Sequence, residues 1–232
     1  MSFDQPLPPF NASDPNATFL STSCLDFLLI EIVPMTYRIT NEIDAAASSS
    51  SSVADLSSGG SPEARSNSNG AVDTASASNA TTGAVDGTGS RRLDEDEERD
   101  AVFFRLDGLG YRVGLGLVER FSRDRPRFND TLDAIKFVCK DLWMLVFKKQ
   151  VDNLKTNHRG VYVLTDNTFR PLVRMSADAG GQAVVRAQPF LWFPCGILRG
   201  ALAAMGITAT VHAETNELPG AIFQIKTIPS KQ

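Results

Sequence analysis

Large apolar side chains are scarce in a long internal stretch of this chain. Between Ala45 and Ser90 there is no aromatic residue, no Ile, no Met and no Lys, and Ser, Ala, Gly, Asn and Thr dominate. Such a composition cannot bury enough apolar surface to offset the entropy of ordering the backbone. We therefore expect a disordered low-complexity insert over 44–100 and a disordered tail over 1–19. The foldable remainder, 20–43 together with 101–230, has the size of one compact domain.

Cysteine and histidine are also scarce, with three cysteines and two histidines in 232 residues. No CxxC motif occurs, and His158 and His212 have no partner at a ligand spacing, so we expect no metal site. Cys24, Cys139 and Cys195 each lie in an apolar run, which predicts three small buried hydrophobic side chains. Free thiols are typical of a reducing compartment.

Targeting and nucleic-acid signals are absent as well. The N-terminus has no basic region of a signal peptide, and Asp26 and Glu31 interrupt its apolar stretch, so we expect neither a signal peptide nor a membrane span. The net charge of −4 gives no basic face for nucleic acid. The acidic run Asp94–Glu98 is interpreted as solvated chain beside the insert. The protein is expected to be cytoplasmic or peripheral on a membrane.

Catalytic motifs do not occur either. There is no nucleophile elbow, no phosphate-binding loop and no paired-carboxylate pattern. We expect no catalytic residue and no cofactor. An enzyme of unrecognised type that uses Cys195 or His158 remains a minor alternative.

Four segments have helical periodicity: Ser21–Asn41, Phe103–Arg123, the run that follows Pro126 up to Lys149, and Pro189–Met205. Pro34 is expected to kink or divide the first. Asn129 or Asp130 can cap the third.

Glycines at intervals of four mark two of these helices. Gly110 and Gly114 lie on one face of the second helix, and Gly196 with Gly200 repeats the spacing in the fourth. Because glycine costs about 1 kcal/mol relative to alanine inside a helix, its presence indicates that another backbone approaches closely. Gly116 is also expected to make such a contact. The alternative is that Gly108 and Gly110 belong to a loop and that the second helix begins after them.

Period-two segments follow the third helix. Strands are expected at about 151–154, 161–164, 207–213 and 221–228, and Phe169–Val173 is expected to be an edge strand because it contains Pro171. Helices and antiparallel strands in separate blocks predict an α+β fold of four helices packed with a four- to five-stranded sheet.

Long runs of the chain resemble the TRAPP (transport protein particle) small-subunit family, in particular its subunit-six branch. The runs are LGYRVGLGLVERF at Leu109–Phe121, FNDTLDAIKFVCKDLW at Phe128–Trp143, the segment Phe147–Leu164, and CGILRGAL at Cys195–Leu202. Their order along the chain is the order in the family.

The resemblance implies the TRAPP small-subunit fold and a non-catalytic role. Family members pair through their first two helices, and this branch is expected to pair with a palmitoylated paralogue. The complex scaffolds a guanine-nucleotide exchange factor for a Rab-family GTPase, in transport from the endoplasmic reticulum to the Golgi and in autophagy. The family implies peripheral association with cis-Golgi, endoplasmic reticulum and trans-Golgi membranes.

One departure separates this chain from the acylated paralogue, which carries a cysteine just before its third helix. Here that region, Arg123–Phe128, has none, so no thioester-linked acyl chain is expected.

The first helix is too apolar for burial on one side only, which favours a partner surface. We predict that the partner interface includes Leu28, Ile32, Val113, Leu117 and Phe121. The alternative function is a lipid-binding module, in which the apolar fourth helix lines a cavity for an acyl chain.

Overall fold

The computed structural model describes residues 20–54, 94–123, 125–157, 159–175 and 182–228. The chain divides into two compact units, one of Met1–Pro34 with Leu106–Gln232 and one of Met35–Arg105. The first unit contains the sheet and most of the helices. The predicted tail at 1–19 lies outside the described residues, as do residues 55–93 of the predicted insert, so both remain predictions. The prediction of disorder was wrong at the two ends of the insert, because 44–54 belong to the first helix and 95–100 to the second.

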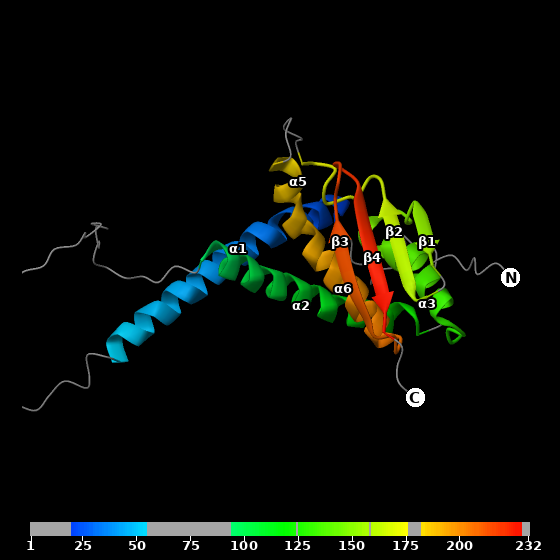
Figure 1. The fold of residues 1–232 in the computed structure, drawn as a ribbon, viewed down its shortest axis with the longest axis horizontal. Coiled ribbons are helices and arrows are strands. Elements are labelled where there is room, and N and C mark those ends of the chain that lie inside the picture. Colours follow the sequence, from blue (N-terminus) through cyan, green and yellow to red (C-terminus); the bar gives the residue numbers. More distant parts are fainter. Residues whose placement is uncertain (1–19, 55–93, 124, 158, 176–181, 229–232) are drawn as a thin grey trace, which may run out of the picture. The chain divides into compact units, whose positions relative to one another are not determined.

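The helical elements of the described chain are coloured by sequence in Figure 1. They are α1 (Thr22–Ala54), α2 (Glu95–Phe121), α3 (Thr131–Phe137), the π-helical turn η2 (Val138–Leu142), α4 (Trp143–Phe147), α5 (Gln182–Ala187), the 3₁₀ turn η3 (Gln188–Leu191) and α6 (Trp192–Ala204). All four predicted helices are present, since α3, η2 and α4 form one continuous helix and η3 leads into α6. The short α5 was not predicted.

Both of the first two helices extend further than the sequence predicted. Pro34 lies inside α1 without ending it, and the helix continues through three alanines, which are good helix formers. At the start of α2, the Asp94 side chain accepts a hydrogen bond from Glu95 N at 2.9 Å. Four acidic residues occupy the first turn of α2, where negative charge interacts favourably with the helix dipole. The acidic run interpreted as solvated chain is therefore also the start of a helix.

The third helix begins and ends at capping residues. Asp130 Oδ1 accepts a hydrogen bond from Asp133 N at 2.7 Å, which confirms one of the two predicted caps. In the π-helical turn, Cys139 O accepts a hydrogen bond from Val151 N at 3.1 Å. Lys148 adopts a left-handed conformation, with φ of 62°, and ends the helix.

Four antiparallel strands form the sheet, in the order β1-β2-β4-β3. Their bounds are β1 Asn153–Thr156, β2 Val161–Asp166, β3 Ala209–Glu214 and β4 Ala221–Thr227. Along β2 and β4 every second residue is buried, as in a sheet with one face on the core. The predicted α+β class, with four helices and an antiparallel sheet, is confirmed.

The prediction of an edge strand at Phe169–Val173 was wrong. This segment forms turns, in which Leu172 N donates to Phe169 O at 2.9 Å. Phe169 and Leu172 are both fully buried, at a spacing of three residues that a strand could not place on one face. Pro171 is accommodated because a turn needs no ladder hydrogen bond from it.

Four aromatic side chains fill the core between the third helix and the sheet. Trp143, Phe147, Phe169 and Phe223 are each at most 2% exposed. Their ring centroids lie 4.5 Å apart for Trp143 and Phe147, 5.2 Å for Trp143 and Phe223, and 5.3 Å for Phe169 and Phe223. Edge-to-face and tilted pairs at these distances are favourable beyond their burial.

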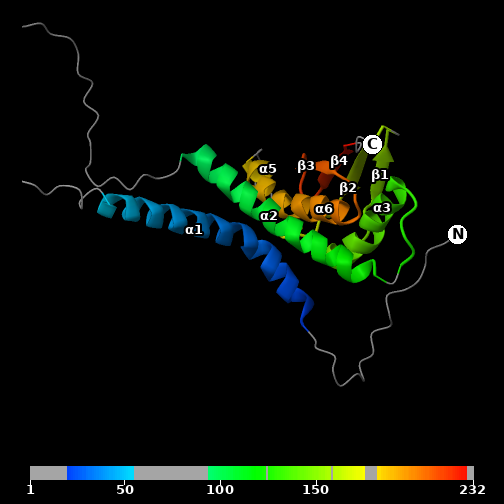
Figure 2. The ribbon, with the colours of Figure 1, turned by 90° about the horizontal axis from the view of Figure 1, so that it is seen from below.

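The C-terminal part of α2 packs against α6 so closely that their backbones are in contact. Figure 2 shows these parts of the two helices side by side. A Cβ atom placed on Gly110 or Gly114 would lie 2.2 Å from a carbonyl oxygen of α6, and one on Gly200 would lie 2.1 Å from Tyr111 O. The predicted close approach is confirmed for Gly110 and Gly114. It was wrong for Gly116, which has nothing within 4 Å of such a Cβ.

Candidate partner-binding site

The N-terminal half of α1 is apolar on two sides. Leu29, Ile32 and Val33 are each at most 5% exposed and face the protein. On other sides of the same helix, Phe27 is 63% exposed and Leu28 is 54% exposed. A single isolated apolar side chain on a surface is ordinary, but neighbouring large ones on one helix are typical of a partner surface.

Two arginines hold this half of α1 on the turn segment that follows the sheet strand β2. Asp26 accepts hydrogen bonds from Arg170 Nε at 2.5 Å and from Arg174 at 3.3 Å. The hydrogen bond from Arg170 holds the pKa of Asp26 below its ordinary value. These ion pairs fix which side of α1 faces the protein, and hence which side carries Phe27 and Leu28.

Within α2, Leu117 and Phe121 lie on the same helix face as Gly110 and Gly114, further toward the C-terminus of the helix. Gly110 and Gly114 pack against α6, so their part of that face is used inside the chain. Val113 is 37% exposed, and Leu117 and Phe121 are half-buried. These three side chains therefore remain accessible beside the α2–α6 contact.

The five predicted interface residues differ in exposure. Leu28 and Val113 are exposed, Leu117 and Phe121 are half-buried, and Ile32 is 5% exposed. Ile32 therefore lies on the side of α1 that packs against the protein and is not accessible to a partner in this structure. The sequence analysis missed Phe27 and Ile30, although their i, i+3 spacing marks a second apolar stripe on α1.

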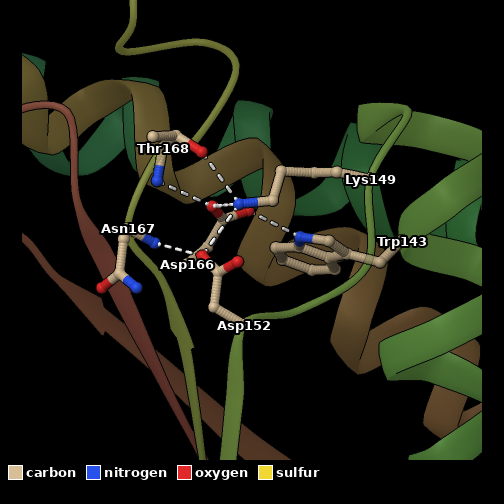
Figure 3. A network of polar contacts seen from close by, with 6 residues as sticks. All are labelled: Trp143, Lys149, Asp152, Asp166, Asn167 and Thr168. Carbon is tan, nitrogen blue, oxygen red and sulfur yellow. Dashed lines mark hydrogen bonds and ion pairs between the residues drawn. The ribbon is translucent and has the colours of Figure 1, made fainter.

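A network of polar contacts joins the end of the third helix to the end of β2 (Figure 3). Asp166, only 1% exposed, accepts hydrogen bonds from Trp143 Nε1 at 2.8 Å and from Lys149 Nζ at 2.6 Å. Lys149 Nζ also donates to Asp152 at 2.8 Å and to Thr168 Oγ1 at 2.9 Å. Because the buried charge of Asp166 is paired, the network stabilises the fold. We call the side chains of Trp143, Lys149, Asp152, Asp166 and Thr168 the latch.

The latch shifts two pKa values. Partial burial alone lowers the pKa of Lys149, but hydrogen bonds to Asp152 and Asp166 outweigh it and leave the pKa above its ordinary value. The hydrogen bond from Lys149 lowers the pKa of Asp152, and the one from Asn167 N adds to this effect. Both shifts favour the charged forms, so neither group is prepared to exchange a proton near neutral pH.

The cysteines do not form a reactive centre. Burial raises the pKa of Cys139 to about 12 and raises that of Cys195 above its ordinary value. A thiol that stays protonated is a poor nucleophile, which weighs against the alternative of an enzyme that uses Cys195. His158, the other residue of that alternative, lies outside the described residues. Cys24 is exposed on α1, so its predicted burial was wrong.

The acyl-chain alternative expected a cavity lined by the fourth helix. A hollow of about 340 Å³ is lined instead by the end of β2, the start of β4 and the loop residues beside them, over 165–167 and 216–222. Another, of about 10 Å³, lies beside Asp26 and Arg170. Ten residues of α6 are buried, and its glycines meet the backbone of α2. In the described part of the chain, no helix is both long and apolar enough to cross a bilayer.

Comparison with known proteins gives consistent relatives. The family described as "Transport protein particle (TRAPP) component" matches residues 25–228. Trafficking protein particle complex subunit 6b of Danio rerio is 50% identical over 130 residues, 56% of this chain and 82% of that protein. Subunit 6B of Homo sapiens is 52% identical over 128 residues, 55% of this chain and 80% of that protein.

Among solved structures, the chain is similar to a trafficking protein particle complex subunit 3 from Naegleria fowleri, which is covalently bound to palmitic acid. That similarity has a TM-score of 0.47 at 13% identity and covers 56% of this chain and 82% of the other.

Proposed function

Because the chain belongs to the TRAPP component family, we propose that it is a non-catalytic subunit of a TRAPP particle and works by pairing with a second small subunit. The observation that supports pairing is the apolar surface of α1, where Phe27 and Leu28 are more than half exposed. Fully burying one such side chain contributes about 1.5–3 kcal/mol, so two or more supply a substantial part of a binding free energy.

The proposed pairing surface consists of Phe27, Leu28 and Ile30 on α1 with Val113, Leu117 and Phe121 on α2. All of them belong to the same compact unit. Leu28 and Val113 are sufficiently exposed for direct contact with a partner. Ile32, also predicted at the interface, would act by holding α1 in place, since it is almost fully buried.

The partner that we propose is the palmitoylated small-subunit paralogue, with the other TRAPP subunits joined around the pair. In that assembly the chain would scaffold a guanine-nucleotide exchange factor for a Rab-family GTPase, in transport from the endoplasmic reticulum to the Golgi and in autophagy. The proposed location is the cytoplasmic side of cis-Golgi, endoplasmic reticulum and trans-Golgi membranes. This role rests on the family relationship and requires no catalytic residue of the chain itself.

Co-purification of the chain with the small-subunit paralogue tests the pairing. Leu28→Asp or Leu117→Asp would require burial of an unpaired charge in the interface, so we expect either variant to abolish co-purification. The circular dichroism spectrum should stay near that of the unsubstituted chain. A matched control is Val185→Asp, which places the same charge at an exposed apolar position on α5, 67% exposed.

The exposed thiol of Cys24 gives a second readout on the same helix. A thiol reagent should label Cys24 in the free chain and react more slowly once the partner is bound. The pairing surface lies elsewhere if the paralogue still co-purifies with both aspartate variants and leaves Cys24 reactive.

A further inference from the structure

The second compact unit, Met35–Arg105, has its large apolar side chains on the outside. Its described part consists of the C-terminal part of α1 and the N-terminal part of α2. The buried residues are Thr36, Thr40 and Val102, two of which are polar. Thr40 Oγ1 uses its hydrogen bond on Thr36 O, one turn earlier in α1. This interior contributes little apolar burial.

Two aromatic rings lie exposed on the α2 part of this unit. Phe104 is 70% exposed and Phe103 is 36% exposed, and their ring centroids are 5.5 Å apart in an edge-to-face arrangement. On the α1 part, Ile39 and Ile43 are 38% and 48% exposed and share one face, because they are four residues apart. In a unit with so small an interior, such side chains are typical of a surface that another molecule covers.

Charge distinguishes this unit from the rest of the chain. Its described residues contain eight carboxylates and only three arginines. The described residues of the other unit, by contrast, contain more basic than acidic side chains, sixteen against eleven. A surface with this excess of carboxylates attracts basic partners and repels acidic ones.

The carboxylates lie on the same side of α2 as the exposed rings. Glu97, Asp100 and Phe104 follow at i, i+3 and i+7, and Asp96 precedes Phe103 by seven residues, so acid and ring share a helix face. Glu97 and Asp100 are themselves exposed. We call the side chains of Asp96, Glu97, Asp100, Phe103 and Phe104 the acidic–aromatic face.

We propose that the acidic–aromatic face docks an amphipathic helix of a protein partner, with lysine or arginine beside its apolar stripe. The rings supply the apolar contact, and the carboxylates one to two turns earlier select basic side chains over acidic ones. A bilayer is a poor occupant, because its anionic lipids repel the carboxylates. The same face of a second copy is also a poor occupant, because it would bring like charges together.

The residues of this face belong to a different compact unit from those of the proposed pairing surface. The inference therefore stands or fails separately from the proposed function. Substitutions at Leu28 or Leu117 should leave it unchanged.

Binding of model helices to the full-length chain tests the proposal. The probe is a fluorescent peptide of about 18 residues made of Leu and Lys in an amphipathic helical pattern, and the comparison peptide has Glu in place of Lys. Fluorescence anisotropy is measured in about 0.15 M salt, where long-range charge effects are largely screened. We expect the Lys peptide to bind and the Glu peptide to bind at least about tenfold more weakly.

Two variants of the chain separate apolar from charge recognition. Phe104→Ser and Asp100→Lys should each weaken the Lys peptide at least about tenfold, equivalent to about 1.4 kcal/mol. Since both positions are exposed, the helix content by circular dichroism should not change. The matched controls, Val185→Ser and Glu119→Lys, alter an exposed apolar and an exposed acidic residue outside this unit and should leave binding unchanged.

Several results would overturn the proposal. They are no binding of the Lys peptide, equal binding of the Glu peptide, or binding that Phe104→Ser does not affect. Co-sedimentation with phosphatidylserine vesicles that is lost in Phe104→Ser would identify the face as membrane-binding instead. A dimer in sedimentation equilibrium that dissociates in the same variant would assign it to a second copy of the chain.

Discussion

The substitution Gly200→Ala provides a direct test of the α2–α6 contact. The added Cβ would lie 2.1 Å from Tyr111 O and 2.8 Å from the Tyr111 carbonyl carbon and Cα, all of them backbone atoms. Backbone atoms cannot rotate away as a flexible side chain can, so the helices must separate by about 1 Å to restore van der Waals distance. That separation would also disturb Gly196, whose own Cβ position lies 2.2 Å from Asp107 O.

The cost of this separation can be estimated from two opposing effects. Alanine is favoured over glycine inside a helix by about 1 kcal/mol, which offsets part of the strain. Overpacking of a well-packed interior costs about 1–3 kcal/mol, and more where backbone must move. Since backbone must move here, we expect a net loss of about 2 kcal/mol in the free energy of unfolding. In a chain of this size the melting temperature should fall by about 4–8 °C.

The assay is urea unfolding followed by circular dichroism, with Gly116→Ala as the matched control. Gly116 lies in α2 and has nothing within 4 Å of an added Cβ, so only the helix preference acts there. We expect Gly116→Ala to raise the free energy of unfolding by up to about 1 kcal/mol. If Gly200→Ala is as stable as the unsubstituted chain, the two helices do not meet at backbone contact and the reasoning is refuted.

Three further predictions concern the latch, pH and the thiols. Asp166→Ala should destabilise the chain by about 3 kcal/mol in urea unfolding, because it removes the buried partner of Trp143 and Lys149. Asp133→Ala removes a carboxylate that is only half-buried and should cost at most about 1 kcal/mol. The pKa values of Asp26 and Asp152 are lowered by folding, so these groups contribute stability that is present above their ordinary pKa of 3.8 and is lost as pH falls through their folded pKa values. The pKa of Lys149 is raised by folding, so this group contributes stability that is present below its ordinary pKa of 10.5 and is lost as pH rises through its folded pKa. The urea midpoint should therefore decline below about pH 4, and equal stability at pH 3 and pH 7 would contradict this assignment. A thiol reagent at pH 8 should modify Cys24 alone in the folded chain and all three cysteines in urea, and early modification of Cys195 would contradict its burial.

Local sequence signals were sufficient for most of the fold. The N-cap at Asp130, the stop at Lys148 and the apolar stripes of the helices depend on neighbours within one or two turns, which a sequence displays directly. The sheet followed from period-two segments separated by turns. The strand prediction at Phe169–Val173 was wrong because a short apolar run with one proline is compatible with both an edge strand and a turn.

The sequence did not show which helices contact each other when they are far apart along the chain. Gly110 and Gly114 indicated a close helix contact, but spacing alone cannot say whether the other helix belongs to the same chain or to a partner. The structure assigns that contact to α6. Gly116 has the same local appearance as Gly114, yet one lies at the contact and the other does not, because a helix presents only one face to its neighbour.

The orientation of α1 follows the same principle. Its sequence is apolar nearly all round, so periodicity could not decide between burying Leu28 and burying Leu29. The decision comes from Asp26, whose ion pairs with Arg170 and Arg174 connect residues far apart in sequence and fix the rotation of the helix. Without that link, α1 could turn Leu28 and Phe27 inward and hide the surface that we propose for pairing. The exposure of Leu28 is thus set by a polar contact of Asp26, which lies on a different side of the helix from Leu28. Asp26, although directed away from a partner, should influence binding as strongly as a residue of the surface itself.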